Sequence, residues 1–420
     1  MKMAFGAYHA AWSIATPFLR RNKRFANGYN ERILANTAPT PVDIWFHAAS
    51  TGEAYLAADL AGSMLQTKPY SILFTTQTEQ GRLILEQVAA IRGDADFQFR
   101  YLPLDIPPLM NRFVQTVNPK AAVLIETELW PAMLRALKKN GSKVMIANGR
   151  ITGRSFRRLK WVSSIWRRLA PDLLLATSDD DAGRFAALFD CPVQVVSNIK
   201  FDQLEIQPTL SEISKADLCS KEAPLVVLGS VRTQEAQAVE KIIRGLLAEK
   251  PDLTFALFPK HVHRLGVWET LLDDIQLPFQ YRSQMKTPAA SGSVILGDTI
   301  GELKMIYGLA DAVFVGGSLA PLGGQNFLEP LLYGRRPVIG PFWDNFKWVG
   351  PGLFDQGFVQ MAHSPKAAAD AILQVLKQSD HQQCQEAVQR YLAVKQGGTE
   401  RTVKALKTLL SSEQEEMVTP

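Results

Sequence analysis

The run Asp311-Ala-Val-Phe-Val315 leads through the segment Gly316-Gly-Ser-Leu-Ala-Pro-Leu-Gly-Gly-Gln-Asn326 into Phe327-Leu-Glu-Pro-Leu-Leu-Tyr-Gly334. This order, in which a β-rich run is followed by a glycine loop and the start of a helix, predicts a cradle for a phosphate group. Glycines let the backbone approach an anion, and a helix N-terminus adds N–H donors. Glu329 falls in the first turn of the predicted helix, and we expect its carboxylate to accept hydrogen bonds from a ribose. The candidate glycines are Gly317, Gly323 and Gly324. The alternative interpretation is a structural turn between a strand and a helix.

Apolar, β-rich runs alternate with helical stretches along most of the chain. The predicted strands are residues 42–48, 71–75, 97–102, 121–125, 143–147, 173–176, 193–196, 225–228, 253–258, 294–296, 312–315 and 337–339. Strands separated by helices predict a parallel, doubly wound α/β sheet. The alternation stops in the polar stretch 203–223 and then restarts, and 420 residues are too many for one ordinary core. The sequence therefore predicts two Rossmann-like halves joined near residue 205.

The composition is that of a folded globular protein, and its excess of positive charge lies near the N-terminus. Hydrophobic residues make up 46% of the chain and charged residues 21%, with a net charge of +5. Residues 1–40 carry Lys2, Arg20, Arg21, Lys23, Arg24 and Arg32 against Glu31 alone, which accounts for that charge. Acidic and basic residues balance in the rest of the chain, which argues against nucleic acid as a partner. Three scattered cysteines and six histidines without metal-ligand spacing predict neither a disulfide framework nor a metal site.

The N-terminal stretch 4–19 is mostly apolar but spans only about 24 Å as a helix, less than a bilayer core. Basic residues follow it, which favours a protein body on the cytoplasmic side. We interpret the segment as an interfacial anchor on the inner face of a membrane, with Phe5, Trp12 and Phe18 on the lipid side. The alternative is a first helix packed on the domain core.

Three glutamates occupy the ends of predicted strands. Glu53 ends the segment His47-Ala-Ala-Ser-Thr-Gly-Glu53, where a strand gives way to a helix, and this position suits a general base. Glu126 and Glu128 follow the apolar strand 121–125. Charged residues at the carboxyl end of a buried strand indicate a site. The alternative role of each is to cap the following helix.

Basic residues gather in two further places. Arg150, Arg154, Arg157 and Arg158 open a stretch with interleaved aromatic residues and no acid before Ala170. As a helix, this stretch offers cations to lipid or saccharide phosphates, and its aromatic residues Phe156, Trp161 and Trp166 to an acyl or membrane surface. The alternatives are a solvated amphipathic face and a nucleic-acid patch. In the second half, the strand ends at Gly229-Ser230 and Phe258 are followed by Arg232, Lys260 and Arg264. These cations, with Gly229, Ser230 and the glycine loop, predict a site for a nucleotide phosphate that needs no metal.

Taken in order, these segments resemble the family of Kdo transferases, which move 3-deoxy-D-manno-oct-2-ulosonic acid (Kdo) from its cytidine monophosphate ester (CMP-Kdo) to lipid A precursors. The resemblance covers nearly the whole chain. Its landmarks are the apolar and basic N-terminus, residues 47–53, Glu126-Thr-Glu-Leu-Trp-Pro131, Asn148-Gly-Arg150, Arg154-Ser-Phe156, Asn198-Ile-Lys-Phe-Asp202, Gly229-Ser230, Gly297-Asp-Thr-Ile-Gly-Glu302, residues 316–326 and Leu328-Glu-Pro330.

The resemblance implies a GT-B fold, in which two Rossmann-like domains face a central cleft, anchored at the cytoplasmic face of the inner membrane. It implies a membrane-associated segment at 1–35, an acceptor-binding domain at 36–205 and a nucleotide-sugar-binding domain at 206–420. By the same comparison, Glu53 is the general base of an inverting displacement that releases CMP, and Glu126 and Glu128 lie near the reaction centre. Lys260 takes the place of a phosphate-binding arginine. The nucleotide pocket is implied to contain Gly323, Gly324, Asn326 and Glu329.

An activated CMP ester demands no cofactor, so none is expected. The implied partners are the CMP-Kdo donor, the lipid A precursor lipid IVA and inner-membrane lipids. Two other functions stay open at this point. One is a nucleotide-sugar 2-epimerase, which shares the fold and the glycine loop. The other is a catalytically idle relative that holds lipid or partner proteins at the membrane.

Overall fold

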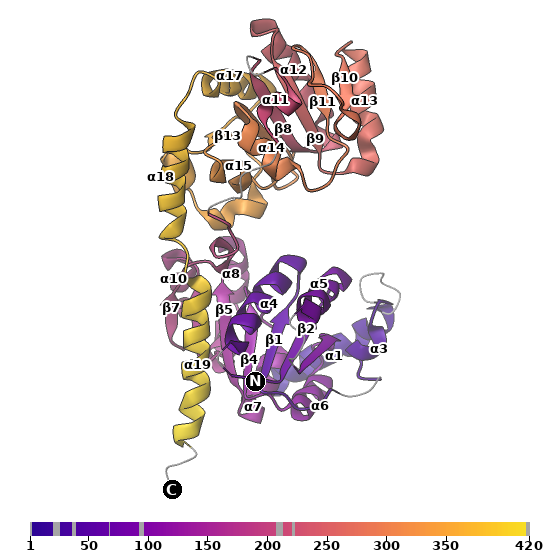
Figure 1. The fold of residues 1–420 in the computed structure, drawn as a ribbon. Helices are drawn as coiled ribbons and strands as arrows, with labels where there is room; N and C mark the ends of the chain where they lie inside the picture. The colour runs from indigo at the N-terminus through magenta and orange to yellow at the C-terminus, as the bar shows by residue number, and fades with distance from the viewer. Residues whose placement is uncertain are drawn as a thin grey trace. The chain divides into compact units, whose positions relative to one another are not determined.

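The chain folds into two compact units, residues 1–204 together with 395–420, and residues 205–394. The computed structural model describes residues 2–19, 26–35, 39–66, 68–91, 96–206, 213–220 and 223–416. Each unit contains a seven-stranded sheet flanked by helices (Figure 1). The predicted α/β fold class is therefore confirmed. The N-terminal cluster Arg20–Arg24 lies outside the described residues.

The sheet of the first unit is parallel, with the strand order β3-β2-β1-β4-β5-β6-β7. Its strands are β1 (Ile44–Ala48), β2 (Ile72–Thr76), β3 (Phe97–Tyr101), β4 (Ala121–Ile125), β5 (Lys143–Gly149), β6 (Leu173–Ala176) and β7 (Val193–Val195). The helices are α1 (Lys2–Leu19), α3 (Tyr29–Arg32), α4 (Thr51–Leu65), α5 (Glu79–Ile91), α6 (Pro107–Val117), α7 (Pro131–Asn140), α8 (Gly153–Lys160), α9 (Ser163–Arg168), α10 (Asp179–Leu188) and α19 (Gly398–Glu416).

The sheet of the second unit is also parallel, with the order β10-β11-β9-β8-β12-β13-β14. Its strands are β8 (Leu225–Val231), β9 (Thr254–Pro259), β10 (Phe279–Tyr281), β11 (Val294–Leu296), β12 (Ala312–Val315), β13 (Pro337–Ile339) and β14 (Gln360–Met361). The helices are α11 (Lys215–Leu218), α12 (Ala236–Glu249), α13 (Leu265–Asp274), α14 (Leu303–Leu309), α15 (Leu328–Leu332), α16 (Gly352–Asp355), α17 (Pro365–Val375) and α18 (His381–Ala393).

The two strands that the sequence did not predict, β10 and β14, are the edges of the second sheet. They are short and only partly buried, so they lack the continuous apolar run that marks the inner strands. The predicted inner strands agree with the structure to within a few residues at each end.

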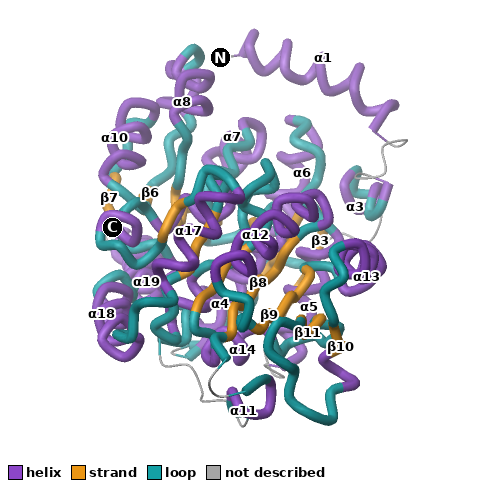
Figure 2. The backbone as a smooth tube through the Cα atoms, turned by 90° about the horizontal axis from the view of Figure 1, so that it is seen from above, coloured by secondary structure: helices purple, strands orange, loops and turns teal. Residues whose placement is uncertain are grey.

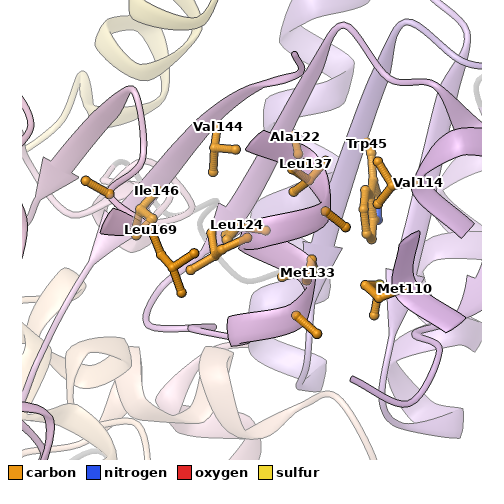
Figure 3. Packing of buried hydrophobic residues seen from close by; sticks show 14 of the residues in the cluster. Trp45, Met110, Val114, Ala122, Leu124, Met133, Leu137, Val144, Ile146 and Leu169 are labelled. Atoms are coloured by element: carbon orange, nitrogen blue, oxygen red, sulfur yellow. The ribbon is translucent and has the colours of Figure 1, made fainter. Parts of the chain in front are cut away.

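Successive residues of the inner strands point to opposite faces of the first sheet and fill two separate cores. Trp45 and Leu124 pack on one face with α6 and α7 (Figure 3), whereas Phe46 and Val123 pack on the other with α4. All four are fully buried. Burial of each large apolar side chain of this kind stabilises the fold by roughly 1.5–3 kcal/mol.

The last helix, α19, returns to the first unit. Val403 and Leu406 lie in the same core cluster as Leu56 and Leu60 of α4. The domain prediction placed all of residues 206–420 in the second half, whereas residues 395–420 group with the first. Nothing in the local sequence of a C-terminal amphipathic helix indicates which core receives its apolar face.

The N-terminal helix α1 packs on the first unit, on the same side of the sheet as α6 and α7 (Figure 2). Phe5, which was predicted to face lipid, is only 5% exposed, and the guanidinium of Arg135 lies 4.5 Å from its ring centre. Ile14 and Phe18 remain 72% and 69% exposed. The alternative of a helix packed on the core is therefore correct for the first turns of α1. Within the described ranges, every helix is too short or too polar to cross a lipid bilayer.

Asp105 joins α1 to the start of α7. Its buried carboxylate accepts hydrogen bonds from the N–H groups of Ala132 (2.9 Å) and Met133 (2.8 Å) and from the Tyr8 hydroxyl (2.8 Å). The first N–H groups of a helix have no partner within the helix, so Asp105 caps α7 from a distant part of the chain.

We predict that Asp105→Ala lowers the free energy of unfolding by about 3 kcal/mol, because it leaves two helix N–H groups buried without acceptors. Tyr8→Phe, which removes one of the three hydrogen bonds, is the matched control and is expected to cost about 1 kcal/mol. Urea denaturation followed by circular dichroism measures both. Equal effects of the two substitutions would contradict the capping role.

Candidate active site

Glu53 lies in the first turn of α4, directly after the turn that leaves β1. One carboxylate oxygen accepts from the Ala49 N–H at 2.7 Å and the other from the Ser50 hydroxyl at 2.8 Å. The Ser50 Oγ in turn accepts from the Glu53 N–H at 3.4 Å, so Ser50 is the N-cap of α4. Glu53 does take part in capping, as the alternative interpretation predicted. The same hydrogen bonds hold its carboxylate at the carboxyl edge of the sheet.

Glu126 and Glu128 follow β4, the neighbour of β1 in the sheet. Glu126 has a left-handed backbone with φ of 59°, and its carboxylate pairs with the Lys200 ammonium at 2.7 Å. Glu128 accepts from the Trp130 indole N–H at 2.7 Å, and its oxygen lies 3.4 Å from Nε2 of His47. Neither side chain is a simple cap, because α7 receives its cap from elsewhere.

The three predicted glutamates are close enough to affect one another. Burial raises the pKa of Glu53 above its ordinary value, and the charge of Glu128 raises this pKa further, with a smaller contribution from Glu126. Hydrogen bonds from Ser50 and Ala49 act in the opposite direction. A carboxylate with a raised pKa is a stronger base and is suited to removing a proton from a hydroxyl group.

Two residues of this cluster had no assigned role in the sequence analysis. His47 is fully buried, and its Nδ1 lies 2.9 Å from the Thr75 hydroxyl, which orients the ring so that Nε2 faces Glu128. Lys200 reaches Glu126 across 74 positions of sequence. Both belong to segments that resembled the family, but no local pattern pairs either residue with its glutamate.

The basic stretch that begins at Arg150 forms two short helices, α8 and α9. Arg154, Arg157 and Arg158 are exposed on α8, a helix without buried residues, and Arg150 is half-buried before it. The interleaved aromatic residues divide into two groups. Trp161 is 90% exposed. Phe156 and Trp166 instead pack against the core of the first unit, so the prediction that these aromatics face a membrane is wrong for them.

In the second unit, the glycine loop connects β12 to α15. Gly317, Gly323 and Gly324 have φ values of 68°, 85° and 78°, which other residues rarely adopt, so the loop requires these glycines for its shape. The Gly317 N–H is occupied, because it donates to the carboxylate of Glu235 at 2.5 Å. This N–H is therefore not available to a phosphate, and the assignment of Gly317 to the phosphate site stays a prediction.

The turn after β8 contains Gly229, Ser230 and Arg232. Gly229 is a packing residue, because a β-carbon there would lie 2.0 Å from the Tyr307 hydroxyl. Ser230 has a left-handed backbone with φ of 54°. Neither geometry requires a ligand.

The cations Arg232, Lys260 and Arg264 lie on two adjacent loops, the turn after β8 and the turn after β9. The Lys260 N–H donates to the Val231 carbonyl at 2.9 Å, and the Arg264 guanidinium donates to the Thr233 hydroxyl at 3.4 Å. Burial lowers the pKa of His261, and the positive charges of Arg232, His263, Arg264 and Lys260 lower it further. Lys260 and Arg264 are exposed and Arg232 is half-buried. The structure thus gathers the three predicted cations into one positive cluster, which is suited to a phosphate.

Asn326 and Glu329 lie together at the start of α15. The Asn326 amide donates to Glu329 at 3.0 Å and accepts from the Leu328 N–H at 3.2 Å. Burial raises the pKa of Glu329, while hydrogen bonding to Asn326 and the charges of Lys304 and Lys260 lower it. The charge of Lys260 therefore lowers the pKa of both His261 and Glu329.

Comparison with solved structures shows the fold. A glycosyltransferase from Rickettsia africae is 11% identical, with a TM-score of 0.57, over 89% of this chain and 99% of that chain. The Anabaena HepE protein in complex with UDP is 14% identical, with a TM-score of 0.53, over 88% of this chain and 100% of that chain. These likenesses, together with the two parallel-sheet units, assign the chain to the GT-B fold.

Comparison of sequences shows the family. A family model described as 3-Deoxy-D-manno-octulosonic-acid transferase (kdotransferase) matches residues 20–203. The 3-deoxy-D-manno-octulosonic acid transferase of Haemophilus influenzae is 33% identical over 385 residues, covering 89% of this chain and 88% of that protein. The enzyme of the same name from Bordetella pertussis is 30% identical over 381 residues, covering 89% of each. With this identity over nearly its whole length, the chain belongs to the 3-deoxy-D-manno-octulosonic acid transferase family of glycosyltransferases.

Proposed function

We propose that this protein transfers Kdo from CMP-Kdo to the lipid A precursor lipid IVA, with inversion at the anomeric carbon and release of CMP. The observation that carries the proposal is the Glu53 carboxylate, fixed at the edge of the first sheet beside Glu126 and Glu128 in a chain of this family. The relatives are named as transferases, so an epimerase is not favoured.

Glu53 is the glutamate best suited to act as the base. Glu126 is paired with the Lys200 cation, and Glu128 is held by the Trp130 indole and lies 3.4 Å from Nε2 of His47. Glu53 is held by the neutral donors Ala49 N–H and Ser50 hydroxyl, and burial raises its pKa. In the proposed step, an acceptor hydroxyl oxygen forms a bond to the anomeric carbon of Kdo. Its proton passes to Glu53, and the bond from that carbon to the phosphate oxygen breaks, so the electron pair leaves with CMP.

The second unit is proposed to bind the donor. We assign the phosphate to the positive cluster of Arg232, Lys260 and Arg264, which would stabilise the negative charge of departing CMP. Glu329, positioned by Asn326, is assigned to the ribose hydroxyls. Lysine at position 260 supplies charge without the bidentate geometry of arginine. The residues assigned to this reaction supply a base and a phosphate site, and the proposal uses no metal or other cofactor.

The first unit is proposed to bind the acceptor at the cytoplasmic face of the inner membrane. The exposed arginines of α8 and the exposed Trp161 offer cations and an aromatic ring to anionic lipid head groups. Ile14 and Phe18 of α1 are exposed apolar side chains in the same unit. These features support peripheral attachment to a lipid surface.

We predict that Glu53→Gln lowers kcat at least about 100-fold, because the amide keeps one acceptor oxygen for the Ala49 N–H but cannot take up a proton. The measurement supplies purified protein with CMP-Kdo and lipid IVA and follows CMP release and lipid mass together. Glu86→Gln, at a partly exposed ion pair on α5, is the control and should keep wild-type activity. An activity of Glu53→Gln within threefold of wild type would refute the assignment of the base. An inactive wild type with an intact fold would favour an idle relative.

The pH dependence of kcat should show an acidic limb set by Glu53, since the protonated carboxyl cannot accept a proton. Because burial and Glu128 raise the pKa of Glu53, this limb should lie above the ordinary glutamate range. Glu128→Gln removes a negative charge and should move the limb to lower pH. Glu126→Gln should move it less in the same direction, because Glu126 contributes less to the shift. An unchanged limb in Glu128→Gln would contradict the coupling.

The triple substitution Arg154→Gln, Arg157→Gln and Arg158→Gln should weaken binding to anionic vesicles by more than about tenfold, at roughly 1 kcal/mol per cation near the surface. Co-sedimentation with vesicles containing phosphatidylglycerol measures the effect, which should diminish as salt is raised. The control replaces three exposed cations of the second unit, Lys241, Arg244 and Lys366, with glutamine. Equal losses in both variants would indicate non-specific attraction by net charge.

A further inference from the structure

Glu235 is a buried acid that neither the proposed mechanism nor the sequence analysis uses. It lies between β8 and α12 and is only 2% exposed. Its Oε1 accepts from the N–H groups of Ser318 (2.9 Å) and Leu319 (2.8 Å). Its Oε2 accepts from the N–H groups of Gly317 (2.5 Å) and Arg232 (3.3 Å). Four backbone donors therefore surround one carboxylate.

Three of these donors are consecutive residues at the start of the glycine loop, with Gly317 in the left-handed conformation. Successive N–H groups in such a turn form a concave site for an anion. In many proteins a phosphate fills a site of this kind. Here the anion is the protein's own carboxylate, so these N–H groups are not available to a ligand.

Glu235 holds the first residues of the glycine loop, and these residues determine the position of the rest of the loop. The Gly317 carbonyl accepts from the Gly324 N–H at 2.7 Å, which links the first glycine pair to the second. The Ser318 hydroxyl donates to the Val315 carbonyl at 2.6 Å and accepts from the Gly340 N–H at 2.8 Å. A shift at residues 317–319 would therefore displace both the second glycine pair and the end of β13.

The same carboxylate reaches the loop that supplies a phosphate-binding cation, because it also accepts from the Arg232 N–H. Arg232 belongs to the positive cluster with Lys260 and Arg264. Glu235 thus connects two loops that follow neighbouring strands, β8 and β12, across 82 positions of sequence.

We propose that Glu235 is a positioning residue for the nucleotide-sugar donor, which fixes the glycine loop relative to the cation loop without touching the donor. The inference rests on the proposed function, because it assumes that these loops bind the donor. A carboxylate suits the task because its two oxygens accept all four hydrogen bonds. Glutamine at 235 has one acceptor oxygen and turns an NH₂ group toward N–H donors. Aspartate keeps the charge but is one methylene shorter.

The experiment measures CMP binding to the full-length protein by isothermal titration calorimetry. Glu235→Gln should raise the Kd for CMP at least about tenfold, since it disrupts hydrogen bonds to a charged group. Glu235→Asp should recover part of this loss, because the anion is restored. Glu240→Gln, at an exposed ion pair on α12, is the matched control and should bind as the wild type does.

Steady-state kinetics separates positioning from general destabilisation. Glu235→Gln should raise KM for CMP-Kdo and leave KM for the lipid acceptor unchanged, whereas partial unfolding would lower the active fraction and reduce kcat for both substrates alike. A folded Glu235→Gln protein with wild-type Kd for CMP would overturn the inference. If this variant does not fold, Glu235→Asp carries the test: weaker CMP binding in the folded Asp variant supports the inference, and wild-type binding overturns it.

These outcomes are distinguishable from failure of the proposed function. A wild-type protein that binds no CMP and transfers no Kdo would refute the proposed function, whatever the variants do. The other case is a wild type that binds CMP and transfers Kdo and a folded Glu235→Gln variant that does both equally well. This result would refute only the role of Glu235.

Discussion

Buried or half-buried carboxylates that accept hydrogen bonds from backbone N–H groups hold the loops of both units in place. Parallel strands all end at one edge of their sheet, and the turns that leave this edge expose N–H groups that no ladder or helix satisfies. Asp105 supplies an acceptor at the start of α7, Glu53 at the turn after β1, and Glu235 at the turn after β12. Each is an acid placed where the backbone presents donors, so its desolvation is compensated without a cation. The geometry of the candidate site depends on these contacts.

This arrangement explains how one residue type performs different tasks in the same chain. Glu235 is enclosed by four donors and is fixed, whereas Glu53 accepts from two and lies beside other carboxylates that raise its pKa. The difference between a structural acid and a candidate base is set by the number of donors around it and by the charge of its neighbours. Both residues follow a central strand of a parallel sheet and lie at the start of a helix, so their positions in the sequence look alike.

The sequence predicts the fold well because the inner strands of parallel sheets are continuous apolar runs, as in 121–125 and 312–315. Three glutamates and three cations of the candidate site were also predicted, since charged residues directly after such runs must lie at the carboxyl edge. The remainder depends on contacts between distant segments. No local pattern shows that Glu235 fills the glycine loop, that Lys200 pairs with Glu126, or that Phe5 is buried. The edge strands β10 and β14 are too short and too exposed to leave a clear signal.

The return of α19 to the first unit affects how the protein is made. Val403 and Leu406 complete a core whose other members belong to residues 44–199. During synthesis, the whole second unit emerges before these side chains become available, a delay on the order of ten seconds or more at usual ribosome speeds. Until then, the face of the first sheet that α19 covers stays open to water and to other nascent chains. Because α19 completes the core of the first unit, this unit is finished after the second unit, although its synthesis begins first. A chain whose synthesis stops before residue 403 would therefore have a complete second unit and an incomplete first unit.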